Sequence, residues 1–210
     1  MILSRYFYIV YAKIVVDLRS KEILWIILPN IFMELFFLFF AGGIIGSAYQ
    51  FYVAIGTTTN NYVSMLLSIP YSIFLDYFSD TKHNSYELLL SKSNMEYALM
   101  FNMFPSYLIA TIISIPSLIY IIYYDALKIV YVIFINLLIY LVSTPFLVRL
   151  GFLIDDIKKV TVFRVINLYL TRLNVAIIPS SNLLTIIPLT LAVPIIYNPV
   201  SVLIQLLIYL

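Results

Sequence analysis

Apolar residues form long, nearly uninterrupted runs along this chain, and short polar segments separate them. The runs show no period-two alternation of polar and apolar residues, so they do not have the pattern of barrel strands. The longest runs cover residues 23–46, 56–78, 97–122, 129–148 and 160–178. Because an α-helix rises 1.5 Å per residue, about 20 residues cross the roughly 30 Å hydrocarbon core of a bilayer. The pattern therefore predicts an all-α bundle of transmembrane helices.

The two ends of the chain differ from these runs. Residues 1–22 mix aromatic and basic side chains, a combination that predicts a helix lying in the membrane interface. Residues 179–210 are apolar but carry Pro188, Pro194 and Pro199. This last segment is either a proline-broken outer segment with no sixth crossing or an incomplete sixth span. We thus expect one transmembrane domain over residues 1–210, with five to six spans and an amino-terminal interfacial helix.

Composition and charge agree with a multi-pass protein of the cell membrane. Apolar residues make up 63% of the 210 residues and charged residues only 10%, against roughly 25% charged residues in soluble domains. Of the 12 basic residues, all but Lys128 and Arg172 lie in the amino-terminal segment or around the loops after the second and fourth spans. By the positive-inside rule these segments are cytoplasmic. The net charge of +2 is too small to indicate a nucleic-acid partner.

The sequence carries no recognisable catalytic motif. It contains no G-x-x-x-x-G-K-[ST] phosphate loop, no H-E-x-x-H motif and no cysteine. The single histidine, His83, lies in a polar loop, and Asp155 and Asp156 adjoin Lys158 and Lys159 as a solvated loop does. We therefore predict neither an enzyme nor a metal or cofactor site.

Two charged residues fall inside predicted spans. Glu34 lies 11 residues past the start of the first run, and Arg172 lies 12 residues past the start of the fifth. Each costs roughly 2.5–3.5 kcal/mol at the bilayer centre on insertion scales. Since both spans run outward, the two residues have nearly the same depth, and we expect an ion pair. The alternatives are that one or both face a water-filled path, or that Arg172 extends toward the membrane surface.

A row of polar residues follows the second span at intervals of four. On a helix of 3.6 residues per turn such a row forms a spiral ridge. Ridges of this kind serve close helix packing and interhelical hydrogen bonds, or they face a translocation path. The row consists of Asn60, Ser64, Ser68, Ser72 and Asp76.

The loop between the second and third spans, with its flanks, resembles the permease family of type-2 ATP-binding-cassette transporters. That family has acidic residues, Gly-Thr, a Glu, paired leucines and a Pro in this loop. Here Asp80, Glu87 and Leu89-Leu90 match. Asn84-Ser85 replace Gly-Thr, and Ser93 stands where Pro is usual. The Asn198-Pro199 pair near the carboxyl end is similar to a second family feature.

The resemblance implies the membrane subunit of an ATP-driven exporter of unknown substrate. It implies a homodimer or heterodimer and a separate nucleotide-binding subunit that docks at the cytoplasmic side. Asp80, Glu87, Leu89 and Leu90 would form the coupling loop, and the Glu34–Arg172 pair could form between protomers. Two other hypotheses remain. One is an ion-coupled secondary carrier that uses Glu34, and the other is a non-transporting membrane scaffold protein.

Overall fold

A computed structural model describes Tyr11 and residues 21–78, 95–153, 157–174, 176, 182 and 188–209. Within these ranges the chain forms helices and no strand, which confirms the all-α class. The predicted interfacial helix lies mostly outside the described residues, as does the predicted coupling loop. The helices are α2 (Lys21–Ile45), α3 (Ser47–Phe78), α5 (Met95–Ile113), α6 (Ile115–Tyr124), α7 (Ala126–Leu153), α8 (Ile157–Arg172), α10 (Leu189–Ile196) and α11 (Pro199–Tyr209).

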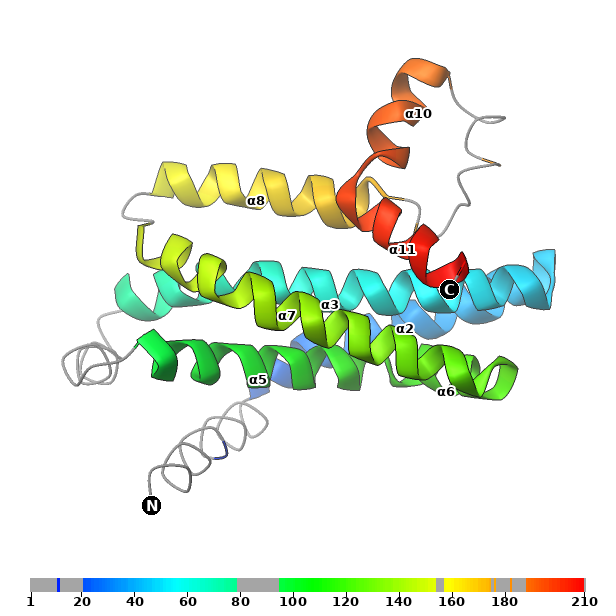
Figure 1. Ribbon diagram of the computed structural model, residues 1–210, viewed down its shortest axis with the longest axis horizontal. Coiled ribbons are helices and arrows are strands. Elements are labelled where there is room, and N and C mark those ends of the chain that lie inside the picture. Colours follow the sequence, from blue (N-terminus) through cyan, green and yellow to red (C-terminus); the bar gives the residue numbers. More distant parts are fainter. Residues whose placement is uncertain are drawn as a thin grey trace.

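Helix α3 is the centre of the bundle. It packs against α2, α5, α6, α7, α8 and α11, and α3, α5, α7 and α8 run along the long axis of the molecule (Figure 1). Most of its side chains face other helices, and the consecutive Thr57, Thr58 and Thr59 are all buried. A helix enclosed in this way needs no apolar outer face. The polar side chains of the second predicted span can therefore face other helices in the centre of the bundle.

The predicted boundaries hold for some runs and fail for others. Runs 23–46 and 129–148 correspond to α2 and α7, and run 56–78 is the second part of a longer α3. Run 97–122 breaks at Ser114 into α5 and α6, which meet at an angle of 64°. Pro116 lies in the first turn of α6, and its ring would clash with the carbonyl four residues earlier in a continuous helix.

In the described part of the carboxyl segment, residues 188–209, the chain forms the two short helices α10 and α11. α10 and α11 meet at an angle of 71°, as a broken span or a re-entrant loop does. Figure 1 shows α10 projecting from the bundle, whereas α11 returns along it. α11 contacts α3, α7 and α8. This segment therefore belongs to the packed structure.

Among the described residues, length and composition identify one helix that can cross a membrane, Ala126–Gly151 within α7, or up to three candidates if each bent pair counts as one span. The outer face of this helix exposes large apolar side chains, including Phe134, Leu138 and Val142. These features are compatible with a membrane protein. They fall short of the five to six spans expected from the sequence. Helix α8 has only 16 residues, or about 24 Å of length, and carries several polar side chains.

Three tyrosines join α3, α5 and α7. Tyr140 is buried and donates a hydrogen bond to the carbonyl oxygen of Tyr62 (2.9 Å). The hydroxyl of Tyr62 lies 2.9 Å from that of Thr111, and the hydroxyl of Tyr107 donates to Ile133 across the α5–α7 contact (3.1 Å). Their rings pack at centroid distances of 4.9–6.3 Å. Each buried hydroxyl thus has a partner, and the cluster fixes the three helices relative to one another.

Candidate functional site

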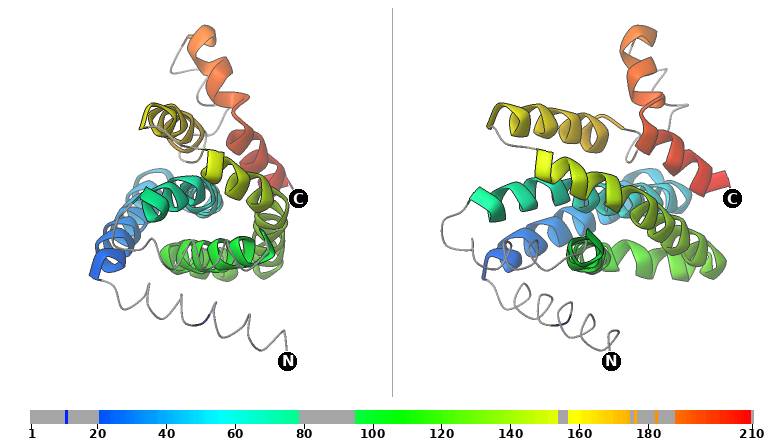
Figure 2. Two further views of the ribbon diagram at one scale, coloured as in Figure 1. Left: turned by 90° about the vertical axis from the view of Figure 1, so that its left-hand side faces the viewer. Right: turned by 60° about the vertical axis from the view of Figure 1, so that its left-hand side comes forward.

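A polar cavity of about 430 Å³ lies between α2, α3 and α8. Helices α2 and α8 both contact α3 but do not contact each other. Figure 2 (left) shows them on either side of α3. The cavity therefore has α3 as its floor and the two outer helices as its walls. Its lining residues are Asn30, Asn60, Asn61, Ser64, Arg164, Asn167, Leu168, Thr171 and Arg172.

The lining is cationic and rich in carboxamides. Two guanidinium groups, four asparagines and two hydroxyl groups face the cavity, and no acidic residue is among the lining residues. Arg164 is held in place by Tyr71: its Nη2 atom donates to the tyrosine hydroxyl (2.7 Å), and its guanidinium carbon lies 4.7 Å from the ring centroid. Arg172 forms no hydrogen bond or ion pair with any residue that the structure describes. The cavity thus holds one anchored and one available guanidinium.

Helix α8 is held in position mainly at its carboxyl end. Asn198, which is fully buried, donates through Nδ2 to the carbonyl oxygens of Leu173 (2.8 Å) and Tyr169 (2.9 Å). Its Oδ1 accepts from the backbone N–H of Val200 at the start of α11 (2.9 Å). The bond to Leu173 satisfies a carbonyl just past the end of α8, where a helix leaves carbonyls without partners, whereas the carbonyl of Tyr169 also accepts the N–H of Leu173 (3.2 Å). The Asn198-Pro199 pair is therefore the joint that fixes the end of α8 against the bend between α10 and α11.

A second contact fixes the segment after α8 on α3. Asn174 donates to Oδ1 of Asn60 (2.9 Å) and accepts from the N–H of Ala176 (2.9 Å). The backbone of Ala176 then lies directly against Gly56, at a place where a Cβ atom on Gly56 would collide with the Ala176 carbonyl. Only glycine permits this approach. These contacts fix the segment that follows α8 against α3.

Glu34 of α2 is buried, with only 3% of its surface exposed, and is not among the residues that line the cavity. The hydroxyl of Thr57 lies 3.4 Å from Glu34 Oε1 and 3.0 Å from the hydroxyl of Ser117. Nearby, Asn61 donates to the hydroxyl of Ser114 (3.1 Å), at the break between α5 and α6. Glu34 Oε2 has no hydrogen-bond partner among the described residues. Glu34 is therefore part of a buried polar cluster that joins α2, α3 and α6.

The structure does not join Glu34 to Arg172 within one chain. Among the described residues, the carboxyl group of Glu34 has hydroxyl neighbours, whereas Arg172 is exposed on the cavity wall. Helix α8 ends at Arg172, six residues before the end of the predicted fifth span, 160–178. A cation in the last helical turn is favoured by the helix dipole. A pair between protomers stays a prediction.

The polar row of α3 divides between two environments. Asn60 and Ser64 line the cavity. The hydroxyls of Ser68 and Ser72 instead donate to carbonyl oxygens of their own helix, those of Met65 (2.7 Å) and Ile69 (2.8 Å). The side chain of Asp76 lies outside the described residues, as do Asp80, Glu87, Leu89 and Leu90.

Sequence reasoning missed most of the cavity wall. The charge pattern places Arg164 beside the cytoplasmic loop after the fourth span, and none of the sequence motifs described above includes Asn30, Asn61, Asn167 or Thr171. The signal was present on α8, where Arg164, Asn167 and Thr171 follow one another at intervals of three and four and so share one helical face.

The chain was compared with protein-family models, curated proteins and solved structures, and none of them matches it.

Proposed function

We propose that this chain is the membrane permease subunit of an ATP-driven exporter. The observation that carries the proposal is the cavity with two arginines in a bundle whose surface is largely apolar. Ionisable residues at membrane depth are expensive and are typically found on substrate or ion pathways. In this proposal Arg172, whose guanidinium has no partner among the described residues, is such an ionisable residue on the substrate pathway.

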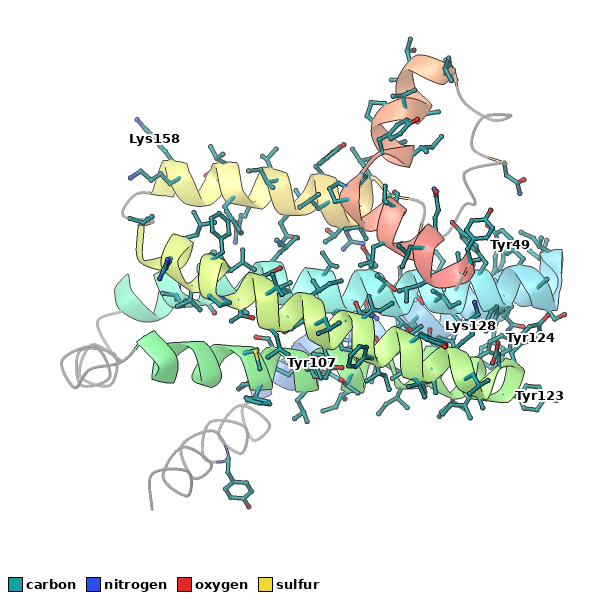
Figure 3. The ribbon with its side chains drawn as sticks, in the orientation of Figure 1. Tyr49, Tyr107, Tyr123, Tyr124, Lys128 and Lys158 are labelled. Carbon is teal, nitrogen blue, oxygen red and sulfur yellow. The ribbon has the colours of Figure 1, made fainter. Side chains whose placement is uncertain are left out.

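The arrangement of the helices supports the proposed orientation. The end of α3, the start of α5, the end of α7 and the start of α8 lie at one end of the molecule (Figure 1). Lys158 marks this end in Figure 3, and the exposed Tyr123 and Tyr124 mark the opposite end. An excess of basic residues favours a cytoplasmic interface, and tyrosines are typical of membrane interfaces on either side. In this proposal the Lys158 end is cytoplasmic.

The order of elements supports the resemblance to the type-2 ATP-binding-cassette permeases. The Asn198-Pro199 pair lies at the bend between α10 and α11, which follow α8 in the chain. Asn198 fixes the end of α8 there through its hydrogen bond to Leu173. The chain lacks a phosphate loop, so the energy would come from a separate nucleotide-binding subunit. The loop containing Glu87 would transmit it, and a second permease protomer would complete the transporter.

The decisive experiment tests for that ATP-binding subunit. The tagged chain is co-expressed with an ATP-binding-cassette subunit from the same source, and co-purification and ATP hydrolysis are measured. We expect a complex whose ATPase activity falls in Glu87→Arg without a fall in the amount of inserted permease. Ser79→Arg introduces the same side chain elsewhere in the loop region and should change little. The absence of any complex would contradict the proposal, and equal effects of both variants would contradict the role of Glu87.

Orientation has its own test, because the chain contains no cysteine to give a background signal. A cysteine at Ser85 should resist an impermeant thiol reagent in intact cells, and one at Ala126 should react. Ala126 is chosen because the neighbouring Asp125 accepts a hydrogen bond from the N–H of Leu127 at the start of α7 (3.0 Å) and should be left intact. The reverse labelling pattern would overturn the orientation.

A second candidate function has one specific observation in its favour. The buried Glu34, with Oε2 lacking a hydrogen-bond partner among the described residues, has the character of a coupling group in an ion-driven carrier. Glu34→Gln distinguishes the two proposals. It would abolish ion-driven uptake in a carrier, whereas ATP hydrolysis by an associated subunit would continue.

A further inference from the structure

The electrostatic character of the cavity selects the sign of its ligand. The lining carries the charges of Arg164 and Arg172 and no carboxylate. A guanidinium has five N–H donors in a planar fork that matches phosphate and carboxylate oxygens. Arg164 uses its Nη2 on Tyr71 and keeps other donors, and Arg172 has no hydrogen bond or ion pair to the described residues. Glu34 of α2 is buried and is not one of the lining residues.

The neutral residues of the wall add hydrogen-bond donors. Oδ1 of Asn60 accepts from Asn174, so its NH₂ group is left as a donor. Asn61 of α3 and Asn167 of α8 also line the cavity, whereas the hydroxyl of Thr171 donates to the carbonyl oxygen of Asn167 (2.7 Å). Carboxamide donors beside two guanidinium groups are the usual surroundings of a bound oxyanion, because each donor replaces a hydrogen bond that the anion made to water.

The access route indicates what the anion is attached to. The cavity-lining residues Asn30 of α2 and Arg164, Leu168 and Arg172 of α8 are exposed, so the cavity is accessible at the surface formed by these two helices. Exposed apolar residues lie on the same two helices, among them Phe32 of α2, Val165 of α8 and the cavity-lining Leu168. A ligand entering by this route places a charged group inside and an apolar body outside. The volume of about 430 Å³ lies within the usual range of roughly 300–1,000 Å³ for ligand pockets.

We infer that the cavity binds the phosphate or carboxylate group of an anionic amphiphile, with Arg172 and Arg164 as its cationic partners. This inference names the substrate class of the cavity and rests on the proposed function for transport. Binding can be measured on the permease chain alone. A failure of binding is therefore distinguishable from a failure to associate with an ATP-binding subunit.

The test is made in nanodiscs of phosphatidylcholine with the purified chain. Phosphatidylglycerol, added phosphatidylcholine and inorganic phosphate are compared by native mass spectrometry and by thermal stabilisation. We expect phosphatidylglycerol to bind and stabilise the protein, and Arg172→Gln to weaken this binding about 10-fold or more, since hydrogen bonds between charged groups are lost. Lys159→Gln removes the same charge from an exposed position of the same helix, outside the cavity, and should leave binding unchanged.

Two further variants keep the inference testable if Arg172→Gln does not fold. Arg172→Lys keeps the charge without the planar fork and should weaken binding less than Gln, and Arg164→Gln should weaken it independently. If inorganic phosphate binds with the same affinity, and this binding depends on the arginines, the result would support the anion site and identify a free anion as its ligand. Equal binding of phosphatidylcholine, or equal losses in Lys159→Gln and Arg172→Gln, would overturn the inference.

Discussion

Asn198, which fixes the end of α8 against the bend between α10 and α11, gives a specific prediction about the stability of the protein. Its carboxamide makes short hydrogen bonds to the carbonyls of Leu173 and Tyr169 and to the N–H of Val200, at 2.8–2.9 Å and in a fully buried position. Asn198→Ala removes all of them and leaves backbone groups without partners. Since a hydrogen bond contributes about 0.5–1.5 kcal/mol net and a buried unpaired group costs about 1–3 kcal/mol, we expect a loss of about 2–4 kcal/mol. For a chain of this size, at about 2–4 °C per kcal/mol, that corresponds to a melting temperature lower by about 4–16 °C.

The assay is thermal unfolding of the purified protein in detergent, followed by circular dichroism. Asn198→Asp should be at least as harmful, because a carboxylate would face carbonyl oxygens and lose the donor. Pro199→Ala is the matched control: the residue is adjacent but exposed at the first position of α11, and its replacement should shift the melting temperature by less than about 3 °C. An Asn198→Ala protein that melts within about 2 °C of the parent would refute the assignment of this residue as the joint.

Other contacts give further predictions. Gly56→Ala should destabilise the protein by about 1–3 kcal/mol, because the new Cβ atom would collide with the backbone of Ala176. Gly151→Ala should destabilise it less, because the new Cβ atom would meet only the side chain of Ile73, at 3.0 Å. Equal melting temperatures of the two variants would contradict the close approach of Gly56 to Ala176. Lys128→Met should loosen the end of α11, because Lys128 Nζ donates to the carbonyl of Ile208 (2.8 Å), and faster proteolysis of that end is the readout. A double-mutant cycle of Glu34→Leu and Arg172→Leu in monomeric protein should be additive within about 0.5 kcal/mol, and stronger coupling would show a direct pair.

The helical class followed from the sequence because hydrophobic runs act locally. A run of about 20 apolar residues without period-two alternation favours a helix wherever it packs, and α2, α3 and α7 form where such runs lie. The absence of catalytic motifs is likewise a property of residue type and spacing. The isolated position of Glu34 among apolar residues also marked it in advance as unusual.

The breaks and the cavity depend on contacts distant in sequence. A proline inside an apolar run is compatible with either a continuous or a broken helix, and Pro145 lies within α7, whereas Pro116 follows a break at Ser114. The partners of Glu34 come from α3 and α6, 23 or more residues further along the chain. Asn30, Asn60 and Arg172 meet around one cavity only because α2 and α8 both pack against α3. Periodicity gives the face on which a side chain lies, but which helix that face meets is decided by packing, and packing is a property of the whole bundle.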